Sequence, residues 1–167
     1  MEQHFSSRRA SRYGLVVALL ALGFAALSVG PALARSSPAT PFRSDVSGTV
    51  VTTGPGGFSL SGSGQSISLG RTGYAGSVQI TSTDSNGVIT DVMTETLTAA
   101  NGDTLTLQCD QTATPVSPGV LHGTDHWTVI GGTGRFTNAS GSGTGSTDAD
   151  LNVGTFSKTS SGRIQYG

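Results

Sequence analysis

Hydrophobic and polar residues alternate along most of the chain from Val46 onward, which is the spacing of β-strands that bury one face. The alternation is clearest over residues 120–130. Short turn sequences, such as Asn86-Gly87 and Asn101-Gly102, separate the runs and favour tight hairpins, because both residue types tolerate a positive φ angle. No stretch after residue 34 has helical periodicity over ten residues. The pattern therefore predicts an all-β domain of about eight short antiparallel strands.

The first 34 residues have a different pattern. Arg8, Arg9 and Arg12 precede an apolar run over residues 14–29, and Ala32-Leu33-Ala34 offers a small-residue cleavage site. The run is shorter than the roughly 20 apolar residues that a membrane span prefers, although a retained anchor is the alternative. We therefore expect a signal peptide that is helical in the precursor and is removed after general secretion. This predicts a secreted or periplasmic protein with no stable membrane anchor.

The segment that follows the cleavage site is rich in proline and small polar residues. Pro38 and Pro41 fall within residues 35–45, a composition typical of a flexible linker. We expect order to begin near Val46 and one domain to occupy residues 46–167. Strands joined by hairpins can protect their edges in a sandwich or in a closed barrel, and alternation alone fits both.

Three glycine-containing motifs follow one another in this domain. They are S-L-G-R-T at residues 68–72, L-T-A-A-N-G-D-T-L at 97–105 and G-G-T-G-R-F-T-N-A-S-G-S-G-T at 131–144. In order and spacing they resemble the allene oxide cyclase barrel-like and dirigent-like proteins, including small exported bacterial members. The resemblance implies a closed, antiparallel, eight-stranded β-barrel. It implies much less about chemistry, because similar barrels serve different functions.

Composition narrows the range of partners. Charged residues make up 11% of the chain, where about 25% is usual, so the expected surface is neutral and rich in hydroxyl groups. Residues 35–167 contain six Lys or Arg against nine Asp or Glu, a formal charge of −3. This argues against a nucleic-acid partner, which requires clustered positive charge. The single cysteine, Cys109, has no internal disulfide partner and is predicted to be a small core residue.

The glycine-rich sequence at residues 131–136 invites comparison with a phosphate-binding loop. That mechanism needs a following helix whose N-terminus faces the anion, and here Ser, Gly and Thr of strand-like character follow. We therefore interpret Gly131, Gly132 and Gly134 as a structural turn. Phe136 is expected to pack across one end of the barrel, with Arg135 at its rim.

The histidines do not predict a metal site. His122 and His126 share a strand face, but about 13 Å separates two positions four residues apart at ~3.3 Å per residue. This is too far for both to bind one metal ion, so both are expected to be exposed. No G-x-S-x-G nucleophile motif is present either. The sequence contains no confident catalytic residue, and no metal or cofactor is expected.

The most informative polar pattern covers residues 89–97. One face carries Asp91 and Glu95 among Ile89, Met93 and Leu97, and the other face is rich in threonine, with Val88 and Val92 in phase. Asp125 occupies a comparable position beside Trp127 on a later strand.

Two orientations of these strands remain open. With the acidic face inward, the carboxylates enter a partly apolar lumen, where desolvation raises their pKa values and favours acid–base chemistry or ligand contact. With the threonine-rich face inward, the carboxylates lie outside. Alternation slightly favours the first orientation, whereas salt bridges with Arg71 and Arg135 are the simpler explanation of the carboxylates.

Three functions fit these observations. The first is non-enzymatic binding of a small hydrophobic or amphipathic molecule, with Asp91, Glu95, Asp125, Trp127 and Tyr74 as the candidate ligand-binding residues. The second is a cofactor-independent, cyclase-like or dirigent-like catalyst that uses one of these carboxylates to steer a reactive intermediate. The third is a structural surface or envelope module that self-associates, and an oligomer is compatible with all three.

Overall fold

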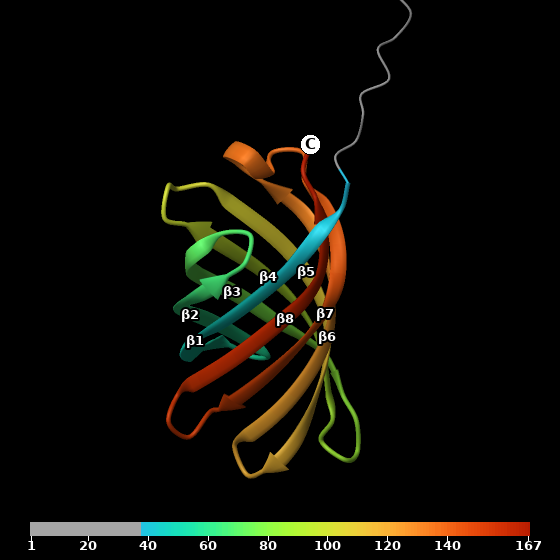
Figure 1. The fold of residues 1–167 in the computed structure, drawn as a ribbon. Helices are drawn as coiled ribbons and strands as arrows, with labels where there is room; N and C mark the ends of the chain where they lie inside the picture. The colour runs from blue at the N-terminus through green and yellow to red at the C-terminus, as the bar shows by residue number, and fades with distance from the viewer. Residues whose placement is uncertain (1–37) are drawn as a thin grey trace, which may run out of the picture. The chain divides into compact units, whose positions relative to one another are not determined.

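The computed structural model describes residues 38–167 and shows a closed antiparallel β-barrel (Figure 1). Each strand pairs with its neighbours in sequence, and the last strand pairs with the first. The strands are β1 (Thr40–Gly54), β2 (Gly57–Ser66), β3 (Gly70–Thr83), β4 (Ile89–Ala99), β5 (Thr104–Ser117), β6 (Val120–Gly132), β7 (Ser140–Asp150) and β8 (Thr155–Gln165). A short 3-10 turn, η1 (Gly134–Phe136), follows β6.

This architecture confirms the predicted all-β, eight-stranded antiparallel barrel, and the sandwich alternative is wrong. The predicted signal peptide lies outside the described residues. Within residues 38–167, no helical segment has the length and apolar character needed to cross a bilayer.

The first strand begins earlier than the sequence suggested. The linker was expected to extend to residue 45, but β1 starts at Thr40, which pairs with Ile164 of β8. Phe42 then points inward, is 2% exposed, and meets Trp127 edge-on at a ring-centroid distance of 5.1 Å. Pro41 precedes Ser44, where the pairing of β1 with β2 begins, so it has a strand neighbour on one side only and its missing N–H is tolerated. Burial of Phe42 therefore orders a segment whose composition resembles a linker.

The two ends of the barrel differ. One end, which we call the η1 end, carries η1, the β2–β3 and β4–β5 turns and the C-terminus (Figure 1). The opposite end, which we call the mouth, carries the β1–β2, β3–β4, β5–β6 and β7–β8 turns. At the η1 end Phe136 is fully buried, stacks on Tyr166 at 5.6 Å and lies 4.9 Å beneath the Arg135 guanidinium. The expected packing of Phe136 across one barrel end is confirmed.

The glycine-rich segment only partly forms the predicted turn. Gly131 and Gly132 belong to β6, where a register shift leaves Ile130 as an extra residue opposite β5. Gly134 does have a positive φ angle, 57°, and any Cβ there would overlap the Asp103 carboxylate. The segment is a scaffold, as expected, but its turn begins after Gly132.

Trp127 is fully buried, and two glycines make room for its ring. Gly143 of β7 and Gly162 of β8 are cross-strand partners, and a Cβ on either would overlap Trp127 Cζ2. The indole Nε1 donates a 3.1 Å hydrogen bond to the Thr144 carbonyl, so the polar atom of the ring is satisfied. The Trp127 ring therefore packs directly against the backbone of β7 and β8 and forms part of the barrel core.

The Gly143→Ala substitution tests this fit. An added methyl group must displace Trp127 or the β8 backbone, and we expect a loss of about 1–3 kcal/mol in the free energy of unfolding, the usual cost of overpacking. Urea denaturation measures it. Gly131→Ala is the matched control, because no atom lies within 4 Å of its Cβ position. Equal stability of the two variants would contradict the proposed packing.

Candidate functional site

The three carboxylates identified in the sequence all face the barrel interior. Asp91, Glu95 and Asp125 are 3%, 1% and 3% exposed, respectively. On β4 the threonines point outward, so the orientation with the threonine-rich face inward is wrong. The barrel therefore places three acidic groups in a largely apolar lumen.

Two of these carboxylates share one buried cation. Lys158 Nζ lies 2.5 Å from Asp125 Oδ2 and 2.7 Å from Glu95 Oε1, and its side chain is 1% exposed. Burial alone would lower the pKa of Lys158, but the charges of Glu95 and Asp125 outweigh it and raise that pKa above its ordinary value. The lysine is therefore a charged strut that joins β4, β6 and β8 across the lumen.

The arginines expected to pair with these carboxylates lie elsewhere. Arg71 is exposed. Arg135 Nη2 donates a 2.9 Å hydrogen bond to the Ser68 carbonyl, and its Nε lies 3.8 Å from Asp103 at the η1 end. Lys158 takes the role instead. The sequence does contain an indication of this: Lys158 is two residues from Phe156 and two from Ser160, and strand alternation places all three on the inward face of β8.

Tyr74 and Cys109 are two further titratable residues close to the strut. Burial raises the pKa of the Tyr74 phenol well above 10, with a further rise from the Glu95 charge, and its hydroxyl contacts Met93 Sδ at 3.7 Å. Burial also raises the pKa of the Cys109 thiol, which is 0% exposed. Cys109 is thus the core residue that the sequence predicted, and neither group is prepared to act as a nucleophile at neutral pH.

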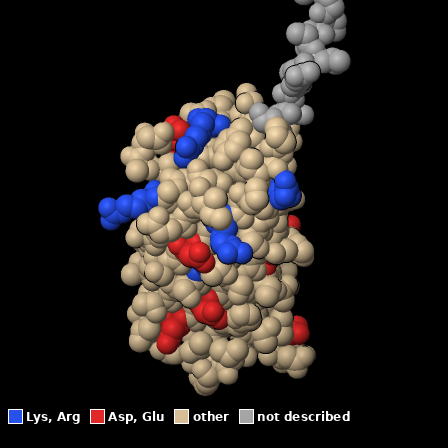
Figure 2. Space-filling view, viewed as in Figure 1, with Lys and Arg blue, Asp and Glu red and all other residues tan. Residues whose placement is uncertain are grey.

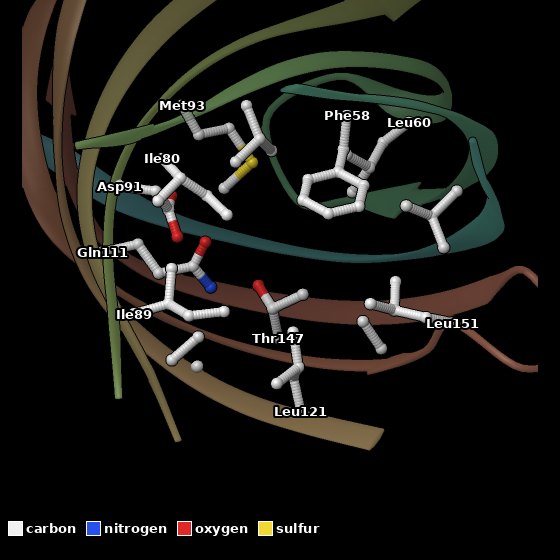
Figure 3. Close-up of a pocket in the computed structure, with 15 residues that line it drawn as sticks. Phe58, Leu60, Ile80, Ile89, Asp91, Met93, Gln111, Leu121, Thr147 and Leu151 are labelled. Atoms are coloured by element: carbon white, nitrogen blue, oxygen red, sulfur yellow. The ribbon is translucent and has the colours of Figure 1, made fainter. Parts of the chain in front are cut away.

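A cavity of about 60 Å³ lies between the strut and the mouth (Figure 3). We call it the mouth cavity. Leu151, at its outer edge, is 39% exposed, so the cavity reaches the molecular surface. Its lining is apolar except for Asp91, Gln111 and Thr147. The apolar lining residues are Val50, Phe58, Leu60, Val78, Ile80, Ile89, Met93, Ala113, Leu121, Gly123, Ala149 and Leu151.

Asp91 is the titratable side chain that lines this cavity. Within the part of the chain that the structure describes, its Oδ1 atom has no hydrogen-bond partner, nor does Thr147 Oγ1. Burial raises the pKa of Asp91, the charge of Lys158 lowers it and the charge of Asp125 raises it, and together they bring it from 3.8 to about 6. Asp91 is therefore a buried carboxylate with unused acceptor capacity in the cavity lining, and it can exchange a proton near pH 6 or accept a hydrogen bond from a ligand that enters the cavity.

The other candidate ligand-binding residues lie deeper in the barrel. Glu95 and Asp125 form the strut, while Tyr74 packs on Phe156 at 5.3 Å and Trp127 fills the core. None of these four candidates lines the mouth cavity. Gln111 and Thr147, which do line it, were not singled out from the sequence, although Gln111 follows Leu107 and Cys109 in strict alternation.

The histidines are on the outer surface. His122 Nδ1 lies 2.7 Å from Asp148 Oδ1, and both residues are exposed, as is His126. The predicted exposure of both histidines is confirmed. They take no part in the mouth cavity.

Comparison with known proteins found no match: no protein-family model, no curated protein and no solved structure matches the chain. The resemblance to allene oxide cyclase-like and dirigent-like barrels therefore stays a prediction that rests on the three motifs. The fold it implies is present, but a barrel by itself assigns no function. The chemistry of the mouth cavity carries the functional argument.

Replacement of the buried cation tests the strut. Lys158→Met leaves Glu95 and Asp125 buried without a counter-charge, and we expect a loss of about 3–5 kcal/mol in the free energy of unfolding at pH 7. Denaturant titration measures it. Arg71→Met, which removes an exposed cation, is the control and should change stability by less than about 0.5 kcal/mol. The triple variant Lys158→Met, Glu95→Gln, Asp125→Asn should recover part of the loss. Similar stability of K158M and R71M would show that the ion pairs of Lys158 do not stabilise the fold.

A second prediction concerns Asp91 and pH. Because its pKa is raised in the folded state, ionised Asp91 weakens folding above about pH 6, and this cost disappears below the ordinary value of 3.8. Asp91→Asn should therefore stabilise the barrel by about 2–3 kcal/mol at pH 8, with a gain that shrinks as the pH falls through 6. Denaturant titrations between pH 4 and pH 8 measure it, with the exposed Asp110→Asn as control. A pH-independent difference between D91N and the parent chain would contradict this account.

Proposed function

We propose that this chain is a non-enzymatic binding protein whose mouth cavity receives one end of a small, partly apolar ligand. The observation that carries the proposal is an apolar cavity, open at one barrel end, in which three polar side chains meet. Small-molecule sites have this composition: apolar walls provide most of the contact area and a few polar groups fix orientation. Secretion of the protein remains a separate prediction from the first 34 residues.

The dimensions of the cavity limit the ligand. A cavity must have a volume of roughly 10–15 Å³ to hold one water molecule. The mouth cavity, at about 60 Å³, therefore accommodates only a few non-hydrogen atoms. The ligand therefore inserts one end and leaves the remainder at the rim. Exposed Val51, Val153 and Leu151 lie at or near this end of the barrel and offer apolar contact there.

The cavity's chemistry favours binding over catalysis. Asp91 is the one titratable group among its lining residues, and no nucleophile accompanies it. A catalyst that steers a reactive intermediate is the second candidate, because a carboxyl group with a pKa of about 6 can serve as a general acid or base near neutral pH. Mass spectrometry distinguishes the two functions: a bound ligand is recovered unchanged, whereas a substrate is converted.

A cavity-filling substitution tests the binding function. Ala113 lines the mouth cavity, so Ala113→Leu should fill it and weaken ligand binding at least tenfold, while Thr114→Leu on the outer face of the same strand should not. Binding of 1-hexanol is followed through the NMR shifts of the Ile80, Ile89 and Leu121 methyl groups. If neither 1-hexanol nor hexylamine causes saturable shifts, the proposed function is wrong.

A further inference from the structure

We infer that the mouth cavity selects ligands that carry a protonated amine, with Asp91 as the counter-ion. This inference rests on the proposed binding function and specifies its ligand class. Three independent features of the described residues support it: the charge balance of the lumen, the arrangement of hydrogen-bond acceptors in the cavity, and the distribution of charge over the two ends of the barrel.

The lumen holds two more carboxylates than cations, and Asp91 is the carboxylate that contacts no cation. Asp91, Glu95 and Asp125 are all buried, whereas Lys158 is the one buried cation among residues 38–167. Lys158 contacts Glu95 and Asp125, and no cation in the described part of the chain pairs with Asp91. A buried carboxylate in this position either takes up a proton or acquires a cation. A cationic ligand supplies a counter-charge for Asp91 and leaves it ionised.

The acceptors in the cavity suit an ammonium group. Asp91 and Gln111 are directly opposite one another on β4 and β5, and Thr147 projects from β7 into the same cavity (Figure 3). Each side chain offers an oxygen that accepts hydrogen bonds, and a primary ammonium group has three N–H donors to satisfy. Asp91 Oδ1 and Thr147 Oγ1 are both buried and have no hydrogen-bond partner among residues 38–167. The apolar walls beyond them fit the carbon chain of an amine.

The outer surface favours the approach of a cation. Asp84, Asp148 and Asp150 lie in or beside the turns at the mouth. The exposed arginines described by the structure lie toward the η1 end, and they are Arg43, Arg71, Arg135 and Arg163. Figure 2 shows this separation, with the blue side chains in the upper part of the barrel and most of the red ones below. A cavity at the acidic end concentrates positively charged ligands.

The same arrangement predicts how binding depends on pH. The buried charged groups of the same lumen are Glu95 on the strand of Asp91, Asp125 on β6 and Lys158 on β8. Burial, opposed by Lys158 and assisted by Asp125, places the pKa of Asp91 at about 6. At pH 7.5 Asp91 is mostly ionised and attracts an amine. Below pH 6 it is protonated, so amine binding weakens while alcohol binding does not.

The test compares three compounds with one carbon chain: hexylamine, 1-hexanol and hexanoate. Their affinities for the full chain at pH 7.5 are measured by the NMR titration described above. We expect hexylamine to bind at least tenfold more tightly than 1-hexanol, and hexanoate to bind most weakly. Asp91→Asn should reduce hexylamine affinity at least tenfold and leave 1-hexanol affinity unchanged. The Asp110→Asn control, on the outer face of β5, should leave both unchanged.

The outcomes separate this inference from the function on which it rests. If hexylamine and 1-hexanol bind equally and Asp91→Asn alters neither, the amine preference is wrong and the binding function stands. If none of the three compounds binds saturably, both are wrong. Binding of 1-hexanol by D91N also shows that the variant is folded, so loss of amine affinity alone reports the missing charge.

Discussion

The ion pairs of Lys158 with Glu95 and Asp125 are the interaction on which the rest of the barrel depends. They connect three strands across the lumen, at 2.7 and 2.5 Å, in a layer where water has little access. Charges buried this deeply tolerate few alternative arrangements, because a strand slip of one residue would turn Lys158 outward and leave both carboxylates without a cation. The strut thus specifies strand register in a sequence whose glycine- and serine-rich strands specify it weakly.

The strut also divides the interior into two parts with different roles. Toward the η1 end, Trp127, Phe42 and Phe136 fill the lumen and provide stability. Toward the mouth, small residues such as Ala113 and Gly123 leave the cavity that Asp91 lines. Under the proposed function, stability and binding therefore come from separate ends. An unpaired buried carboxylate is costly, and proteins commonly tolerate such a cost at functional sites.

Alternation predicted much of this arrangement, because each strand has one face in the lumen. The sequence predicted the alternating faces of β4, β5 and β6 and the hairpins at Asn86-Gly87 and Asn101-Gly102, but it left open which face of β4 points inward. The sequence did not predict Lys158 as the partner of Glu95 and Asp125, because pairing across the lumen depends on how the strands stagger when the barrel closes. The sequence did not predict the mouth cavity either, because the cavity forms where small side chains from several strands meet at one level.

Closure of the barrel has a consequence for the order of folding. Thr40 and Ile164, joined by a hydrogen bond from the threonine hydroxyl, are 124 residues apart in sequence, so β1 finds its second partner only after the whole domain has been made. Pairings of such long range form slowly, and until then both terminal strands keep unpaired edges that invite aggregation. In the open chain Lys158 is hydrated and charged, which helps to keep β8 in solution. The residue that locks the finished barrel thus also protects its last strand while the barrel is still open.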